Sequence, residues 1–137
     1  MAKQVIIIGA PRSGTNMLRN ALTAIEGVET WPCDEINYIW RYGNAKNPSD
    51  QLTVNHASAK TCRYIQKKFK QLEQKTGGTT IVEKTCANSL RVPFVQSIFP
   101  NAKFIFIVRN GLDVIGSAYL RWNSKPEFSY LCKKAIY

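Results

Sequence analysis

The sequence predicts an α/β protein in which helices cover a parallel sheet. Two apolar runs of strand length, Val5–Ile8 and Phe104–Val108, are each followed by apolar residues at helical spacing. A third run, Thr79–Val82, follows a long helical pattern. This alternation favours parallel pairing, because parallel strands need a long crossover connection that is usually a helix.

The first half of the chain predicts a strand and two helices. Val5–Ile8 is a continuous β-branched run that ends at Gly9, as a buried parallel strand does. A helix is expected after the turn, with Gly27 as a stop. Its apolar face would comprise Met17, Leu18, Ala21, Leu22 and Ile25. Residues 28–58 are predicted to be irregular, and a second helix is expected over Lys60–Lys75. That helix would bury Ile65, Phe69 and Leu72 and end at Gly77-Gly78.

The second half predicts two strands and two more helices. Thr79–Val82 is the expected second strand, and Lys103–Val108 is the strongest strand signal of the chain. Between them, Leu90, Phe94 and Ile98 indicate a helix with Pro93 in its first turn. The last predicted helix has an apolar face formed by Leu112, Ile115, Tyr119 and Trp122. No repeat or linker interrupts the pattern, so residues 1–137 are expected to form one domain.

Composition excludes several classes of protein. The chain is 45% hydrophobic and 20% charged, which argues against disorder, a collagen-like repeat and a coiled coil. No apolar run approaches the roughly 20 residues of a membrane helix, so no membrane association is expected. The net charge of +10 suits an anionic partner such as a nucleotide, a sulfated glycan, a nucleic acid or a membrane surface.

The cysteines and the single histidine indicate no metal site. Cys33, Cys62, Cys86 and Cys132 are far apart, without a C-x-x-C pair, and His56 stands alone. We therefore expect reduced thiols, no metal and, since no signal peptide is evident, a cytoplasmic protein. His56 is expected to be structural or solvated.

The turn between the first strand and the first helix, GAPRSGTN, is the first candidate site. Backbone N–H groups in such a turn, together with the helix N-terminus, bind phosphate or sulfate. Ser13 and Thr15 can add hydroxyl donors, and Arg12 can add a charge with forked donors.

The same turn differs from the loop of nucleotide triphosphatases. The spacing of Gly9 and Gly14 is that of G-x-x-x-x-G-K-[ST]. However, Thr15 replaces the lysine, and Asn16 replaces the magnesium-binding hydroxyl. An ordinary ATPase or GTPase is therefore disfavoured.

Two further constellations are predicted at the same edge of the sheet. Arg109 follows the strongest strand, where open α/β sheets bind ligands, and Ser117 lies eight residues later in the following helix. Glu83-Lys84-Thr85 leaves the second strand toward that edge, where Lys84 would enter the site as a point charge.

Taken together, these residues resemble the sulfotransferases that use 3′-phosphoadenosine 5′-phosphosulfate (PAPS). Pro11–Thr15 is similar to the loop that holds the 5′-phosphosulfate, and Phe104–Tyr119 is similar to the segment that holds the 3′-phosphate. Glu83-Lys84-Thr85 matches the stretch between them, and order and spacing agree from about residue 4 to residue 122. The resemblance implies a three-layer α/β/α fold, similar to that of the P-loop triphosphatases.

The resemblance also implies an activity and the residues that carry it. The activity is sulfuryl transfer from PAPS to a hydroxyl or amine of a small-molecule or glycan acceptor, with PAP as the product and no metal. The implied cofactor-binding residues are Arg12, Ser13, Gly14, Thr15, Asn16, Arg109 and Ser117. Arg12 and Lys84 would stabilise charge on the sulfuryl group.

A glutamate is the implied general base. The cytosolic members that sulfate small molecules have a histidine after the lysine-threonine pair, but here that position is Cys86. Glycan-modifying members use a glutamate after the first helix, which corresponds to Glu35, with Asp34 as a second candidate. We expect Glu35→Gln to keep nucleotide binding and lose turnover, because a general base contributes about 10²–10⁴-fold.

The chain departs from the family pattern in length. Only residues 123–137 follow Trp122, so the usual C-terminal portion, which completes the 3′-phosphate and adenine site, is expected to be missing. Two alternatives therefore stay open, a non-catalytic anion or nucleic-acid binding domain and a P-loop kinase relative.

The remaining polar and aromatic features are ambiguous. The basic helix carries Lys60, Arg63, Lys67, Lys68, Lys70 and Lys75. A solvated face explains these cations better than a nucleic-acid partner does. Four aromatic residues could line a pocket or pack against the helices, namely Trp31, Tyr38, Trp40 and Tyr42.

Overall fold

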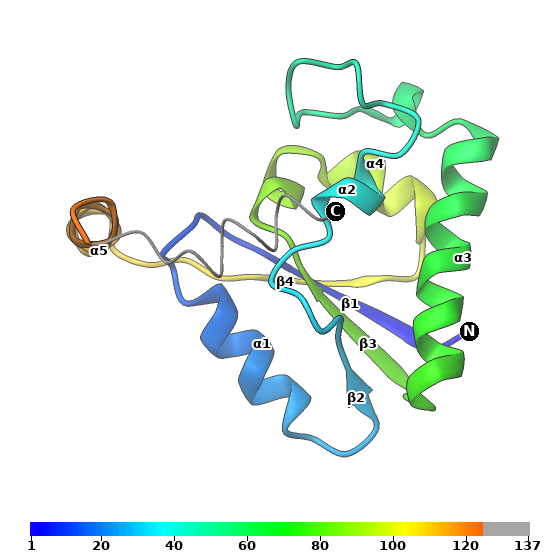
Figure 1. Cartoon of the computed structure of the whole chain (residues 1–137), viewed down its shortest axis with the longest axis horizontal. Helices are drawn as coiled ribbons and strands as arrows, with labels where there is room; N and C mark the ends of the chain where they lie inside the picture. The colour runs from blue at the N-terminus through cyan, green and yellow to red at the C-terminus, as the bar shows by residue number, and fades with distance from the viewer. Residues whose placement is uncertain (125–137) are drawn as a thin grey trace.

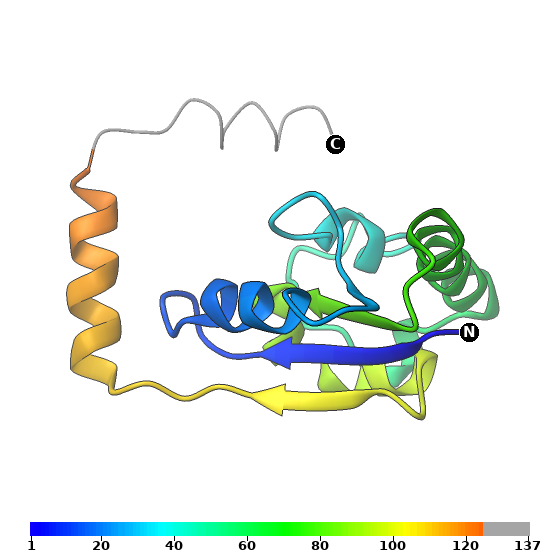
Figure 2. The ribbon, with the colours of Figure 1, turned by 90° about the horizontal axis from the view of Figure 1, so that it is seen from below.

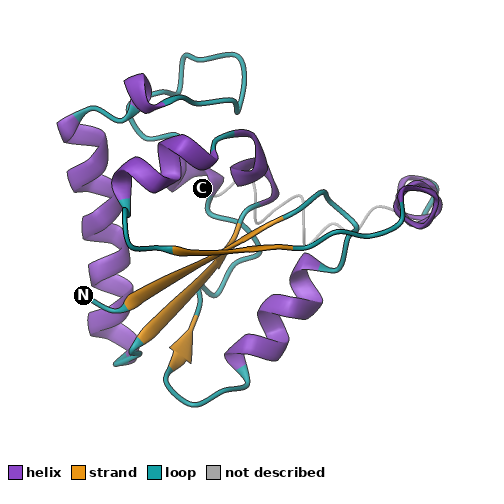
Figure 3. Ribbon diagram, turned by 180° about the vertical axis from the view of Figure 1, so that it is seen from behind, coloured by secondary structure: helices purple, strands orange, loops and turns teal. Residues whose placement is uncertain are grey.

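A computed structural model describes residues 1–124 and confirms the α/β class. Four parallel strands form one sheet in the order β2-β3-β1-β4. The strands are β1 (Lys3–Ile8), β2 (Val28–Glu29), β3 (Thr80–Lys84) and β4 (Lys103–Phe106). The main helices are α1 (Thr15–Thr23), α2 (Asn37–Trp40), α3 (Ala59–Thr76), α4 (Val92–Ile98) and α5 (Gly111–Trp122). Helix α1 lies on one face of the sheet, and α2, α3 and α4 lie on the other (Figures 1 and 3).

The main core fills the space between the sheet and the three helices α2, α3 and α4. Ile6 and Ile7 are both fully buried, as expected for a central strand that is covered on both faces. Trp40 and Phe69 meet edge to face at 5.6 Å and join α2 to α3. Other fully buried core side chains include Ile36, Ile39, Leu52, Ile65, Ile81, Phe94, Val95 and Ile98.

Helix α3 confirms its predicted face and its predicted end. Ile65, Phe69 and Leu72 are buried. Ser58 caps the N-terminus by accepting a hydrogen bond from the Thr61 amide. Gly77 ends the helix in the left-handed conformation with φ of 72°, which favours glycine.

Three predictions for the segments that lead to the site are wrong in part. Residues 28–58 are not wholly irregular, because they contain β2, α2 and a 3-10 helix, η1 (Val54–His56). The second strand is Thr80–Lys84 rather than Thr79–Val82, so Glu83 and Lys84 lie within the strand and are buried. A second 3-10 helix, η2 (Cys86–Leu90), follows this strand. Helix α4 therefore begins only at Val92, and Leu90 precedes it and is exposed.

The last predicted helix forms, but its apolar face is not core. Leu112, Ile115, Tyr119 and Trp122 are all between 65% and 83% exposed. Figure 2 shows why, since α5 stands apart from both helical layers. The strand before it, β4, ends at Phe106 instead of Val108, and both of these side chains are exposed.

Two global features of residues 1–124 bear on the class of protein. None of the helices in this part of the chain combines the length and apolar content needed to cross a bilayer. Cys33, Cys62 and Cys86 carry free thiols. Cys132 and the C-terminal stretch discussed above from residue 125 onward lie outside the described residues.

Candidate functional site

The candidate site lies at one edge of the sheet, where the carboxyl ends of β1, β3 and β4 meet. All three strands run parallel, with Ile7 beside Lys84 and Ile8 beside Phe106. The segments after them therefore emerge together, although they are far apart in sequence. This edge is where open α/β sheets bind ligands.

The turn after β1 is held in place by close packing against the chain after β4. A Cβ on Gly9 would lie 2.6 Å from Ile107 Cγ2 and 2.8 Å from the Ile107 carbonyl oxygen, so only glycine fits. The Gly9 amide also donates to Ser89 Oγ at 3.0 Å. Arg12 and Gly14 adopt left-handed conformations with φ of 70° and 95°. These contacts give the turn one defined path into α1.

The turn has the features of an anion site. Ser13 and Thr15 are buried, and the first turn of α1 carries no acidic residue. The first turn of α1 therefore supplies no carboxylate of its own that would compete with a bound anion for its amides.

Arg12, Arg109 and Ser117 come together beside this turn. Arg12 Nε donates to Ser117 Oγ at 3.0 Å, across 105 positions of sequence. Arg109 donates from NH1 to the Arg12 carbonyl oxygen at 3.1 Å, and its Nε lies 4.0 Å from Asp113 Oδ2. Arg12 and Arg109 are exposed, so two guanidinium groups face solvent at the rim of the turn.

Lys84 lies at the centre of a second cluster at the end of β3. Its Nζ is 3.0 Å from Asp34 Oδ1 and 3.2 Å from Glu35 Oε1, and its side chain is only 2% exposed. Glu35 Oε1 also accepts the Cys86 amide at 3.2 Å. Residues 34–35 and 84–86, separated by about fifty positions, thus form one ionic cluster.

The electrostatics of this cluster keep Lys84 and Asp34 ionised. Burial alone would lower the pKa of Lys84, but Glu35 and Asp34 outweigh it and raise that pKa. Burial alone would raise the pKa of Asp34. The hydrogen bond and charge of Lys84, together with the nearby Asn16 and Arg19, outweigh burial and hold this pKa below its usual value. Lys84 is therefore a cation and Asp34 an anion at neutral pH.

Cys86, which stands where a histidine base would be, cannot replace that base. Burial raises the pKa of its thiol to about 11, and the neighbouring Glu35 carboxylate adds to the shift. Its Sγ lies 3.9 Å from Thr15 Oγ1, which links the turn after β1 to the turn after β3. Its backbone amide also donates to Glu35, the candidate base.

Several residues at this edge were missed by the sequence analysis. Arg19 on α1 donates to the Asp34 carbonyl oxygen and lies 3.4 Å from Asp34 Oδ1. Behind Lys84, Asn88 and Arg91 were also missed. Both are almost fully buried, as are Glu83 and Thr85 of the predicted Glu83-Lys84-Thr85 constellation. Arg91 could not be found from a sequence pattern, because a single arginine before a short helix is ordinarily a surface residue.

The other sequence candidates lie away from the site. His56 Nδ1 accepts the Thr53 amide at 3.0 Å within η1, which is a structural role, as expected. Trp31 and Trp40 pack on Phe69, and Tyr42 stacks on Tyr64 at 3.6 Å. These three aromatic residues pack against the helices.

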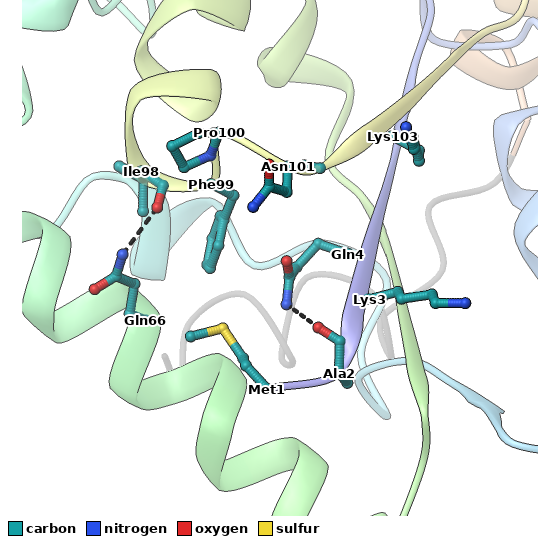
Figure 4. A pocket seen from close by; sticks show the side chains of 11 residues that line it. Met1, Ala2, Lys3, Gln4, Gln66, Ile98, Phe99, Pro100, Asn101 and Lys103 are labelled. Carbon is teal, nitrogen blue, oxygen red and sulfur yellow. Dashed lines mark hydrogen bonds between the residues drawn. The ribbon is translucent and has the colours of Figure 1, made fainter.

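A pocket of about 670 Å³ lies at the opposite, amino end of the sheet (Figure 4). It is lined by residues near the starts of β1 and β4 and by the end of α4, and Gln66 Nε2 donates to the Ile98 carbonyl oxygen at its wall. It contains none of the predicted site residues. Over residues 1–124, moreover, no three histidine, cysteine, aspartate or glutamate side chains gather as metal ligands.

Comparison with known proteins gives the family. A family model described as "Sulfotransferase family" matches residues 4–135, which is nearly the whole chain. No curated protein matches it. The chain therefore belongs to the sulfotransferase family, whose common chemistry is sulfuryl transfer.

Proposed function

We propose that this sulfotransferase-family chain binds PAPS at the carboxyl edge of its sheet and transfers the sulfuryl group to an acceptor hydroxyl or amine. The observation that carries the proposal is the contact of Arg12 Nε with Ser117 Oγ. It joins the turn expected to bind the 5′ side to the pair expected to bind the 3′-phosphate. A nucleotide with anionic groups at both positions needs two neighbouring anion sites.

The residues at this edge fit such a nucleotide. The turn offers backbone amides, the hydroxyls of Ser13 and Thr15, and the guanidinium of Arg12. Arg109 supplies a second exposed guanidinium with forked donors, which suit a phosphate group. When bound, PAPS supplies the sulfuryl group and a phosphate leaving group.

Lys84 is proposed to stabilise charge at the leaving oxygen. Its raised pKa keeps it protonated at neutral pH, and its nearly complete burial strengthens its electrostatic effect. Its two carboxylate partners fix the position of its ammonium group.

Glu35 is proposed as the general base, in preference to Asp34. Asp34 contacts both Lys84 and Arg19, and its lowered pKa makes it a weak base. Both contacts of the Glu35 carboxylate given above use Oε1. We assign Oε2 the acceptor proton. The acceptor oxygen or nitrogen would form its bond to sulfur as the bond from sulfur to the phosphate oxygen breaks, with PAP as the leaving group.

The test is thermal unfolding with the product PAP, in EDTA, against magnesium-ATP. A ligand at about 100 times its dissociation constant adds about 2.7 kcal/mol to the folded state. We expect a shift with PAP that needs no metal and is larger than the shift with ATP. Arg109→Ala should reduce the shift. Arg63→Ala is the control and should not, because Arg63 is also exposed but lies on α3, which carries none of the predicted site residues.

Three outcomes would contradict the proposal. A shift with magnesium-ATP alone would favour a kinase relative. Salt-sensitive binding of nucleic acid without any response to PAP would favour a binding module. Equal PAP shifts in the two arginine variants would remove Arg109 from the site.

A further inference from the structure

Residues 84–86, at and after the end of β3, contact residues 34–36, which lie directly before α2. Lys84 Nζ contacts the carboxylates of Asp34 and Glu35. The Cys86 amide donates to Glu35 Oε1. Between them, Thr85 Oγ1 accepts the Ile36 amide at 3.2 Å. Of the contacts made by residues 84–86, the Thr85 contact is the one that acts on the backbone of residues 34–36.

The Thr85 hydroxyl is oriented from behind by a buried chain of hydrogen bonds. Its one proton is donated to Glu83 Oε1, which leaves its lone pairs for the Ile36 amide. Glu83 Oε2 accepts from Asn88 Nδ2 at 2.7 Å, and Asn88 Oδ1 accepts from Arg91 Nε at 2.8 Å. Above the Glu83 pKa of about 7, a carboxylate at one end and a guanidinium at the other thus set the direction of every donor in between.

This chain of hydrogen bonds lies in the protein interior, where solvent water does not compete for the same donors and acceptors. Glu83, Thr85, Asn88 and Arg91 are each at most 1% exposed. A buried donor or acceptor that lacks its hydrogen bond lowers the stability of the fold, so the observed geometry at Thr85 is strongly favoured. None of the four side chains faces the exposed rim where Arg12 and Arg109 lie.

We propose that Thr85 is a positioning residue for Glu35: anchored on buried Glu83, its hydroxyl fixes the Ile36 amide and thereby aims the Glu35 carboxylate at Lys84. This rests on the function proposed for Glu35. Thr85 itself touches neither nucleotide nor acceptor. Its effect on turnover passes entirely through Glu35.

Amide hydrogen exchange tests the positioning without any activity. In Thr85→Val, exchange at Ile36 is expected to become about tenfold faster, because valine has the shape of threonine but no acceptor. Thr85→Ser keeps the hydroxyl and is expected to keep Ile36 protected. The matched control is Thr76→Val, because Thr76 Oγ1 also accepts a backbone amide, that of Gly78, at the far end of α3.

A double-variant measurement tests the link to Glu35. PAP release from PAPS, with water as acceptor, should fall about tenfold in Thr85→Val when Glu35 is present. In a Glu35→Gln background, the same substitution should change the rate less than twofold, because the group that Thr85 aims is no longer a base. The dissociation constant for PAP should stay the same throughout.

Several results would overturn the inference. One is unprotected exchange at Ile36 in the folded wild-type chain, which is decisive even where Thr85→Val fails to fold. Another is exchange at Ile36 that is equal in Thr85→Val and wild type, or an equal loss of PAP release with and without Glu35. A wild-type chain that binds PAP but releases none from PAPS would instead count against the proposed function, and the exchange experiment would still decide the role of Thr85.

Discussion

On the Lys84 side of the site the charged groups are buried or half-buried and each makes several contacts, whereas on the Arg109 side they are exposed and make one or two. Lys84 is 2% exposed at its side chain and contacts two carboxylates. Arg109 is 43% exposed and contacts one carbonyl oxygen and, at 4.0 Å, one carboxylate. The Lys84 ammonium group is therefore held in position before any ligand binds, whereas the Arg109 guanidinium has further N–H donors available for a ligand.

This difference separates stability from binding. Substitutions in the buried half should change the free energy of unfolding, because they leave charges or hydrogen-bonding groups without partners. Substitutions in the exposed half should change ligand affinity and leave the fold intact, because surface ion pairs contribute little. The following predictions test that division, beginning with the largest expected effect.

Lys84→Met should have the largest effect on stability. It removes the buried cation between Asp34 and Glu35 and leaves two carboxylates close together. We expect the free energy of unfolding to fall by about 3 kcal/mol, the lower end of the range for a broken buried pair, since water still reaches Asp34. Urea denaturation measures the change.

The matched control for this experiment is Lys103→Met. Lys103 begins β4 at the far end of the sheet and is exposed. Its replacement should change stability by less than about 0.5 kcal/mol. Similar losses in the two variants would contradict the distinction between the buried and exposed halves.

Glu83→Gln should have the next largest effect, seen as a change in pH dependence. Burial raises the pKa of Glu83 from 4.5 to about 7, although its hydrogen bond from Thr85 opposes the shift. Between these values the folded chain binds a proton that the unfolded chain does not, so wild-type stability should fall as pH rises. At 1.36 kcal/mol for each pKa unit, the loss is about 3 kcal/mol at most.

In Glu83→Gln this slope should disappear, because glutamine does not titrate. Urea denaturation at pH 5 and pH 7.5 compares the two proteins, with exposed Glu26→Gln as the control. Asp34 and Asp50 have lowered pKa values and act in the opposite sense, but only below about pH 4. The prediction fails if wild type and Glu83→Gln lose the same stability between the two pH values.

The exposed half of the site was predictable from the sequence because its residues obey local rules. Glycines at fixed spacing after an apolar run, and an arginine after a strand, identify a turn and a strand end without knowledge of the rest of the fold. The structure accordingly brings Arg12, Arg109 and Ser117 together. Their ligand remains a prediction.

The buried half was predictable only in part, because its contacts cross long distances in sequence. Lys84 was predicted at this edge from the end of the second strand, and Glu35 was proposed from the resemblance. The structure places Lys84 Nζ and Glu35 Oε1 3.2 Å apart. Arg91 and Asn37 gave no signal, although Arg91 NH2 donates to Asn37 Oδ1 at 2.6 Å. Because Glu83 and Lys84 are polar, the sequence analysis ended the strand before them, whereas both lie within β3 and are buried. Their burial depends on partners far away in sequence, which a local pattern does not reveal.

The apolar stripe of α5 was predictable as a helix but not as a surface. Periodicity predicts which residues share a face, and that face is normally buried. Here the segment between β4 and α5 carries the helix away from both layers, so the stripe meets no core (Figure 2). The periodicity of a sequence predicts which residues share a helix face, but it does not predict where the helix lies relative to the core.

Ile115→Gln should therefore have the smallest effect of all. Ile115 is 66% exposed on α5, so replacing it removes little apolar burial, and the free energy of unfolding should change by less than about 0.5 kcal/mol. The same substitution at Ile65, which is fully buried on α3, should cost more than about 3 kcal/mol, because it places an amide in the core. Urea denaturation of both variants makes the comparison. A large loss at Ile115 would mean that the α5 stripe is covered in solution, and α5 would then belong with the buried half rather than with the exposed one.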